Sequence, residues 1–69
     1  MSDHVYRVTE VVGTSQESIA AAIRNGVARA AKTVRNVEWF EGLESRGAVA
    51  PDGTITFQVS LKVGFRLED

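Results

Sequence analysis

The chain contains no cysteine, and it has only one histidine, one proline, one methionine, one tryptophan and one tyrosine among its 69 residues. These scarcities exclude a disulfide framework, and with His4 as the only imidazole they exclude a zinc site built on sulfur and imidazole ligands. An apolar fraction of 43% suits one small domain over residues 1–69. Because such a domain buries only about 60% of the surface of its unfolded chain, we expect self-association to supply further stability.

The chain also lacks an excess of charge of one sign and lacks long apolar runs. Eight Lys plus Arg residues oppose nine Asp plus Glu residues, for a formal charge of -1, which is too balanced for the basic surface that phosphate backbones require. No run approaches the roughly 20 apolar residues that span a bilayer, and the first residues lack a signal-peptide core. We therefore expect a cytoplasmic protein that binds neither nucleic acid nor a membrane.

The first half of the chain predicts a strand followed by a helix. The β-branched and aromatic residues from His4 to Val12 favour a strand. The segment Thr14–Glu17 fits a capping box with Thr14 as the N-cap, so we expect the helix to begin there. An apolar stripe then follows the helical period and should face a sheet, whereas Gly26 and the many alanines would allow a strand to approach closely. The stripe consists of Ile19, Ile23, Val27, Ala30 and Val34.

The second half predicts a hairpin. A half-exposed strand from about Asn36 to Gly47 is followed by the turn residues Pro51–Thr54. The last strand, Ile55–Leu67, is apolar at every second position, so one of its faces is core. The predicted fold class is therefore α+β, with β-α-β-β order and a three-stranded antiparallel sheet packed on one helix. One helix cannot cover such long strands, so we expect a closed homo-oligomer.

Two side chains stand out as ligand candidates. Trp39 on a half-exposed strand is most simply a core or subunit-interface residue, but its indole can also stack on a flat aromatic ligand. Gln58 is most simply an outward polar residue, but its amide can also match the donors and acceptors of a heterocycle. A hairpin without bulges places Gln58 opposite Arg46 and turns Trp39 to the other face. Joint contact with one ligand then requires a bulge near Gly42 or Gly47, or residues from two subunits.

Catalytic groupings are weak. Glu38, Glu41 and Glu44 are candidates for acid and base, but strand alternation is expected to send Glu41 to the face opposite the other two. The serines have no histidine partner except His4, which we expect to be a solvated residue near the start of a strand. We therefore assign no catalytic residues and no metal ligands, and we expect a binding protein rather than an enzyme.

Several segments together resemble the dodecins. The similarity covers nearly the whole chain and is strongest in the last strand. It comprises Val12–Ser15, Ala30–Arg35, Trp39–Glu41, Arg46–Gly47 and Phe57–Glu68. The sequence departs from the family pattern at Gly42, where many dodecins have a β-branched residue, and in the loop 48–54.

The resemblance implies a hollow homododecamer that stores and sequesters flavin at subunit interfaces. By position, Trp39 resembles the tryptophan that stacks on the flavin, and Gln58 resembles the glutamine that bonds its edge. Arg46 and Arg66 resemble residues near the flavin and the interface. FMN is the implied cofactor, with riboflavin as an alternative. Coenzyme A is a possible second ligand, for which Arg29 and Lys32 are loose candidates. The rival interpretations are a structural oligomeric shell and an accessory to a flavin-dependent redox enzyme.

Overall fold

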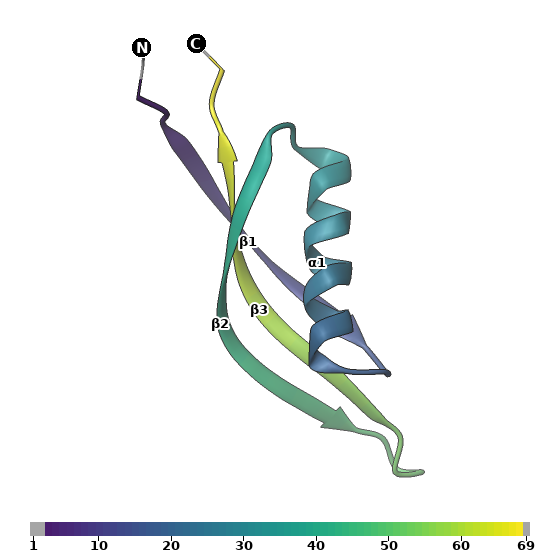
Figure 1. The fold of residues 1–69 in the computed structure, drawn as a ribbon. Coiled ribbons are helices and arrows are strands. Elements are labelled where there is room, and N and C mark those ends of the chain that lie inside the picture. The colour runs from purple at the N-terminus through teal and green to yellow at the C-terminus, as the bar shows by residue number, and fades with distance from the viewer. Residues whose placement is uncertain (1–2, 69) are drawn as a thin grey trace.

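The computed structural model describes residues 3–68 and confirms the β-α-β-β order. Strand β1 (Tyr6–Ser15) leads to helix α1 (Ile19–Thr33), and β2 (Val37–Val49) and β3 (Ile55–Arg66) form the hairpin. The sheet order is β1-β3-β2 with both pairings antiparallel. Helix α1 lies on one face of this sheet, and the curved β2–β3 hairpin extends beyond the start of the helix (Figure 1). Within residues 3–68, no further layer covers the other face of the sheet.

The core depends on the alternation of β3, the central strand. Its odd-numbered positions face α1, as the sequence predicts, and Val59, Leu61 and Val63 are buried there. Only small helix residues join them: Ala21, Ala22 and Ala30 complete the buried apolar set of the described residues. The core is thus thin, in keeping with a protein whose dimensions are 55 × 20 × 14 Å.

The start of the helix differs from the prediction. Thr14 is not the N-cap, because β1 continues through Gly13 to Ser15 and pairs Thr14 with Gln58 of β3. Ser18 is the N-cap instead, and its Oγ accepts a hydrogen bond of 3.0 Å from the Ala21 backbone N–H. Strand pairing therefore outweighs the local capping signal, since ladder hydrogen bonds and cap bonds compete for the same residues.

The contact between α1 and β1 is unusually close. A β-carbon placed on Gly13 would overlap the backbone carbonyl of Ala22, and one on Gly26 would lie 2.9 Å from the Leu61 side chain. Gly26 thus marks a close approach, as expected. The predicted helix stripe is correct only in part. Ala22, Gly26 and Ala30 are buried on the helix, and Ile23 and Val27 of the predicted stripe pack against the same core, partly buried. Ile19, at the start of the helix, is 41% exposed.

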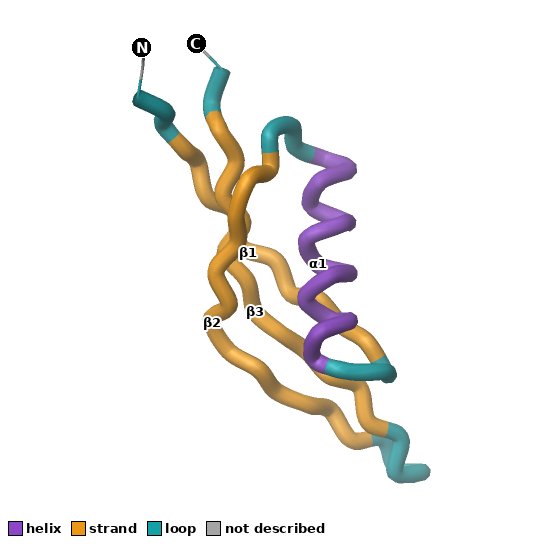
Figure 2. The backbone as a smooth tube through the Cα atoms, viewed as in Figure 1, coloured by secondary structure: helices purple, strands orange, loops and turns teal. Residues whose placement is uncertain are grey.

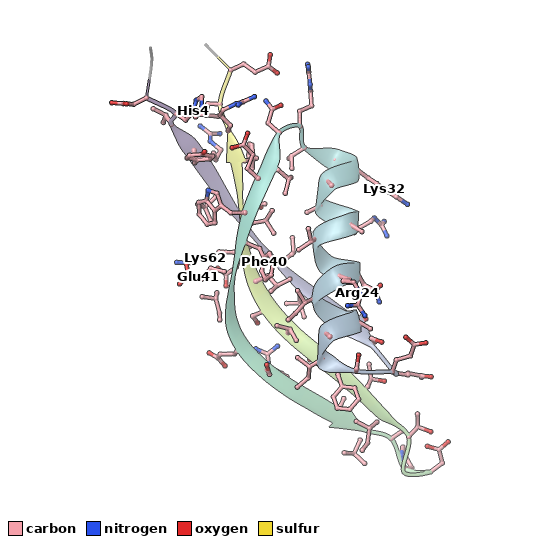
Figure 3. The ribbon with its side chains drawn as sticks, viewed as in Figure 1. His4, Arg24, Lys32, Phe40, Glu41 and Lys62 are labelled. Atoms are coloured by element: carbon pink, nitrogen blue, oxygen red, sulfur yellow. The ribbon has the colours of Figure 1, made fainter. Side chains whose placement is uncertain are left out.

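Strand β2 receives little cover from the helix. All of its residues except Val37 are exposed, and Phe40 is 50% exposed although it points toward α1 (Figure 3). Between them lies an open apolar groove of about 550 Å³, lined by Ala20, Ile23, Arg24, Val27, Ala28 and Phe40. So much open apolar surface on a small chain is typical of an assembling subunit, which agrees with the predicted closed homo-oligomer.

Hydrogen bonds support the α1–β2 and β2–β3 connections, two of the three segments that Figure 2 draws in teal between the elements. Asn36, with φ of 65°, turns the chain from α1 into β2, and its amide donates to the Arg66 carbonyl at 3.2 Å. In the hairpin turn Gly53 has φ of 91°, and the Asp52 carboxylate accepts from the Thr54 N–H at 2.9 Å, which lowers the Asp52 pKa.

Among residues 3–68, the structure has no helix long and apolar enough to cross a membrane.

Candidate functional site

A β-bulge in β2 decides which side chains share the uncovered sheet face. From the turn, the register runs without interruption to Glu44 opposite Ser60 and includes Arg46 opposite Gln58, as predicted. The register then shifts between Gly42 and Glu44, so Leu43 is an extra residue. Because one inserted residue reverses the alternation that follows it, Trp39 comes to lie opposite Gly64. Trp39 therefore shares a face with Gln58, through a bulge near Gly42, which is one of the alternatives that the sequence left open.

The Trp39 indole covers Gly64 of the central strand. A β-carbon built on Gly64 would overlap three atoms of the indole ring, Cδ2, Cε2 and Cζ2, and Gly64 is buried although it lies on the face away from α1. Trp39 itself remains 38% exposed. Glycine at position 64 thus supplies the space for the ring, and the ring presents its other side outward.

Two polar contacts and one aromatic contact lie beside the same indole. A second register shift, between Val37 and Trp39, makes Glu38 the extra residue. The Tyr6 hydroxyl donates to Glu38 Oε1 at 2.9 Å, and Arg66 Nη1 lies 3.2 Å from Glu38 Oε2. The Tyr6 ring meets Trp39 edge-on, with centroids 5.9 Å apart and an interplanar angle of 63°. The hydrogen bond to Glu38 is the largest cause that raises the Tyr6 pKa.

The other predicted ligand residues lie together farther along the sheet. Gln58 is half-buried on β3, and Arg46 stands opposite it on β2. Arg46 Nη2 donates to Ser60 Oγ at 2.9 Å and lies 3.7 Å from Glu44 Oε2, so its guanidinium is held over the face it shares with Gln58. The Thr14 position of β1 completes this row of paired residues.

The four predicted ligand residues thus form two separate pairs. We call Trp39 with Arg66 the indole end and Gln58 with Arg46 the amide end. Gly64, beneath the indole, and Gln58 are six positions apart on β3, which corresponds to about 20 Å along the strand. The structure brings all four to one face but does not bring the two ends of one chain together.

The predicted placement of Glu41 on the face opposite Glu38 and Glu44 is wrong. Because of the bulge, Glu41 pairs with Lys62 and Glu44 with Ser60, so both lie on the face away from the helix. Figure 3 shows Glu41 and Lys62 side by side on this side of the sheet. Glu38 reaches the same face through its contacts with Tyr6 and Arg66. Strict alternation fails wherever an extra residue enters a strand.

Sequence reasoning missed two residues that contact Trp39 of the indole end, Tyr6 and Gly64. The break in the alternating polar pattern of β3 at Gly64 was the available signal, since a glycine inside a strand often marks a close approach. Tyr6 could not be placed because its neighbour across the sheet depends on the register between β1 and β3. Among residues 3–68, no group of three or more His, Cys, Asp or Glu side chains is arranged to hold a metal ion.

Comparison with known proteins gives one consistent result. The family model described as Dodecin matches residues 5–68. The chain is 51% identical over 65 residues to the dodecin of Thermus thermophilus, with 94% of each chain covered. It is 33% identical over 63 residues to the calcium dodecin of Mycobacterium tuberculosis, covering 91% of this chain and 89% of that protein. The solved dodecin of Streptomyces davaonensis has a TM-score of 0.91 at 50% identity and covers 99% of this chain and 100% of that one.

Proposed function

Because the chain belongs to the dodecin family, we propose that it binds and sequesters flavin, with FMN as the natural ligand, at the interfaces of a hollow homododecamer. The observation that carries this proposal is the exposed Trp39 indole over Gly64. The ring is supported on one side by the backbone of the central strand and is open on the other. An isoalloxazine ring stacked there would gain roughly 0.5–1.5 kcal/mol beyond the burial of area.

The surroundings of the indole suit a flat, partly apolar ligand. Val8 lies opposite Gly64 on β1 and is 45% exposed, and Val12, on the same face, is 55% exposed. These side chains would be buried with the ligand or with a neighbouring subunit. Binding pockets of this kind combine apolar lining with a few polar groups that orient the ligand, and the amide of Gln58 is such a group.

The distance between the two ends supports a site composed of two subunits. A separation of about 20 Å along β3 exceeds what the edge of one three-ring system can bridge. In a twofold pairing, each surface meets the same surface of the other copy in reverse direction. The indole end of one subunit can then face the amide end of the other, and each pair of subunits would form two equivalent sites.

The charges of the site favour FMN over riboflavin. Arg46 is exposed enough to reach solvent and sits at the amide end, while Arg66 borders the indole. A phosphate group carries charge that guanidinium groups bind as a fork of donors. Riboflavin offers no such group, so we expect it to bind more weakly and to lose less affinity when Arg46 is replaced.

Sequestration rather than catalysis follows from how the acidic groups are used. Glu38 is already bound to Tyr6 and Arg66, and Glu44 lies beside Arg46. A general acid or base has to reach a proton of the substrate, whereas these contacts engage both carboxylates with residues of the chain itself. The flavin would supply its own redox and light-absorbing chemistry, and the residues of this chain would bind it, orient it and exclude water from it.

A flavin titration of the assembled protein tests the proposal. FMN fluorescence should be quenched on binding to the wild type, and Trp39→Ala should weaken binding and restore the fluorescence. Glu17→Gln is a suitable control, because Glu17 is exposed in the segment between β1 and α1 and does not belong to the uncovered sheet face. A wild type that binds no flavin, or a Trp39→Ala variant with unchanged affinity, would refute the proposal. Size measurement by light scattering tests the dodecamer directly.

Complementation tests the composite site. Trp39→Ala and Gln58→Ala chains are unfolded together, mixed in equal amounts and reassembled. If each site takes its indole and its amide from different copies, random assembly restores both groups in about a quarter of the sites. If one chain supplies both groups, no site is restored. Each variant reassembled alone gives the baseline.

Coenzyme A remains a secondary ligand in this proposal. Arg29 lines a groove of about 390 Å³ between β1 and α1, together with Gly13 and Gly26, whereas Lys32 borders a different hollow near the end of the helix. The two loose candidates therefore do not share one groove. Titration of coenzyme A into protein saturated with FMN, with Arg29→Ala and Lys32→Ala compared, shows which of them contacts it. Equal binding by both variants and the wild type would remove both residues.

A further inference from the structure

We propose that Tyr6 re-reduces Trp39 after the indole has lost an electron, and that Glu38 accepts the phenolic proton in this step. The inference rests on the proposed function only for its oxidant, which is a photoexcited flavin held against the indole. The transfer itself involves residues of this chain alone, and it can therefore be measured without any flavin.

The geometry supplies both parts of a proton-coupled electron transfer. The Tyr6 and Trp39 rings touch edge to face, with centroids 5.9 Å apart, so an electron has only a van der Waals contact to cross. The Tyr6 hydroxyl already donates to Glu38 Oε1 at 2.9 Å, within the range in which a proton transfers directly. Arg66 holds the second oxygen of that carboxylate at 3.2 Å and fixes its position.

After the first electron has left the indole, the remaining electron and proton transfers balance among Trp39, Tyr6 and Glu38. The oxidant takes one electron from the indole and leaves a Trp39 radical cation. Tyr6 then gives one electron to the indole while its O–H bond breaks and the proton moves to Glu38. The products are neutral Trp39, a neutral Tyr6 radical and a protonated Glu38. The cycle closes when the reduced oxidant returns its electron to Tyr6 and Glu38 returns the proton.

The surroundings of the phenol agree with this role. Because the hydrogen bond to Glu38 raises its pKa, Tyr6 keeps its proton throughout the neutral range. The groups that face it are Glu38 from β2, Arg66 from β3 and His4 from the segment before β1, whose ring centroid is 6.4 Å away. Among the described residues, His4 is the alternative proton acceptor in ring contact with Tyr6, and the test must separate it from Glu38.

The chemistry would protect the stacking platform. Trp39 is the only tryptophan, so its irreversible oxidation would destroy the site, and Tyr6 is the only tyrosine. A phenol that returns an electron to the indole within the lifetime of the tryptophanyl radical prevents that loss. The same uniqueness makes every tryptophanyl or tyrosyl signal assignable to one residue.

Pulse radiolysis of the flavin-free assembled protein tests the proposal. Azide radicals oxidise the indole, and time-resolved absorption follows the tryptophanyl radical and the tyrosyl radical separately. In the wild type, the tyrosyl signal should rise at the rate at which the tryptophanyl signal decays, independently of protein concentration. Tyr6→Phe should abolish the tyrosyl signal. Glu38→Gln keeps a hydrogen-bond acceptor of the same shape but a much weaker base, and should slow the transfer by ~10-fold or more. His4→Gln should leave the rate unchanged.

The proposal is overturned if the tryptophanyl radical decays equally fast in the wild type and in Tyr6→Phe. An unchanged rate in Glu38→Gln would overturn the part assigned to Glu38, and a slowed rate in His4→Gln would assign that part to His4 instead. Circular dichroism and light scattering confirm that each variant is folded and assembled. Because these measurements contain no flavin, their failure is distinct from a failure of flavin to bind. Under steady illumination with FMN, Tyr6→Phe should also lose its Trp39 emission faster than the wild type.

Discussion

Substitution of Gly64 by alanine offers a sharp test of how the candidate site is built. The added methyl group would occupy the space of the Trp39 ring, overlapping its Cδ2, Cε2 and Cζ2 atoms. Backbone on both sides pairs with β1 and β2 and cannot move away. The indole therefore has to leave its place over β3. Gly42→Ala is the matched control, because a β-carbon there meets nothing within 4 Å.

The expected cost follows from the area involved. A tryptophan side chain buries 150–250 Å², and Trp39 is 38% exposed. Displacing the ring would return roughly 100 Å² of apolar surface to water, which costs about 2.5 kcal/mol at about 25 cal/mol per Å². Replacing a strand glycine by alanine recovers about 0.5–1 kcal/mol of backbone entropy. The net loss is therefore about 1.5–2 kcal/mol for Gly64→Ala, against a gain of about 0.5–1 kcal/mol for Gly42→Ala.

Urea unfolding at one fixed protomer concentration measures these differences, because the stability of an assembling protein depends on concentration. The emission of the single tryptophan should shift to longer wavelength in Gly64→Ala and stay unchanged in Gly42→Ala. Flavin affinity should fall with the first substitution only. A Gly64→Ala protein with wild-type stability, emission and flavin affinity would show that the indole does not depend on the space above Gly64.

The other predictions concern packing, capping and pH. Gly13→Ala should destabilise the protein by about 1–3 kcal/mol in urea unfolding, because its methyl group would meet the Ala22 carbonyl; wild-type stability would contradict the close helix contact. Ser18→Ala should cost about 1 kcal/mol as the loss of an N-cap, whereas Thr14→Ala should cost clearly less, and the reverse order would restore Thr14 as the cap. Tyr6 should ionise above the usual pKa of 10.0 in an absorbance titration, and Glu38→Ala should bring it down. Because the pKa of Tyr6 is raised in the folded state, the protonated phenol contributes its full stabilisation below the pKa of the unfolded state. This stabilisation is lost as the pH rises through the pKa of the folded state. A Tyr6 titration that Glu38→Ala does not change would show that the hydrogen bond is not the cause of the shift.

Local patterns determined the elements of this protein. Seven alternating apolar positions from Ile55 onward predicted a strand with one buried face. The middle positions Val59, Leu61 and Val63 are buried, whereas Ile55 and Leu67 at the two ends are 45% and 40% exposed. The turn chemistry around Gly53 set the start of the hairpin register, and so the pairing of Arg46 with Gln58 followed from counting. The residues Trp39 and Gln58 could be selected from the sequence because their chemistry is rare in this chain.

Tertiary structure alone decided which of these residues meet. The extra residues Leu43 and Glu38 reverse the alternation of β2, and a bulge has no reliable local signature because its cost is repaid by pairing with β3. The helix start moved from Thr14 to Ser18 for a similar reason, since β1 gains partners on β3 by continuing. The contacts of Tyr6 with Glu38 and Trp39 join residues more than 30 positions apart. Such contacts depend on the register of three strands at once, which no local stretch of the chain contains.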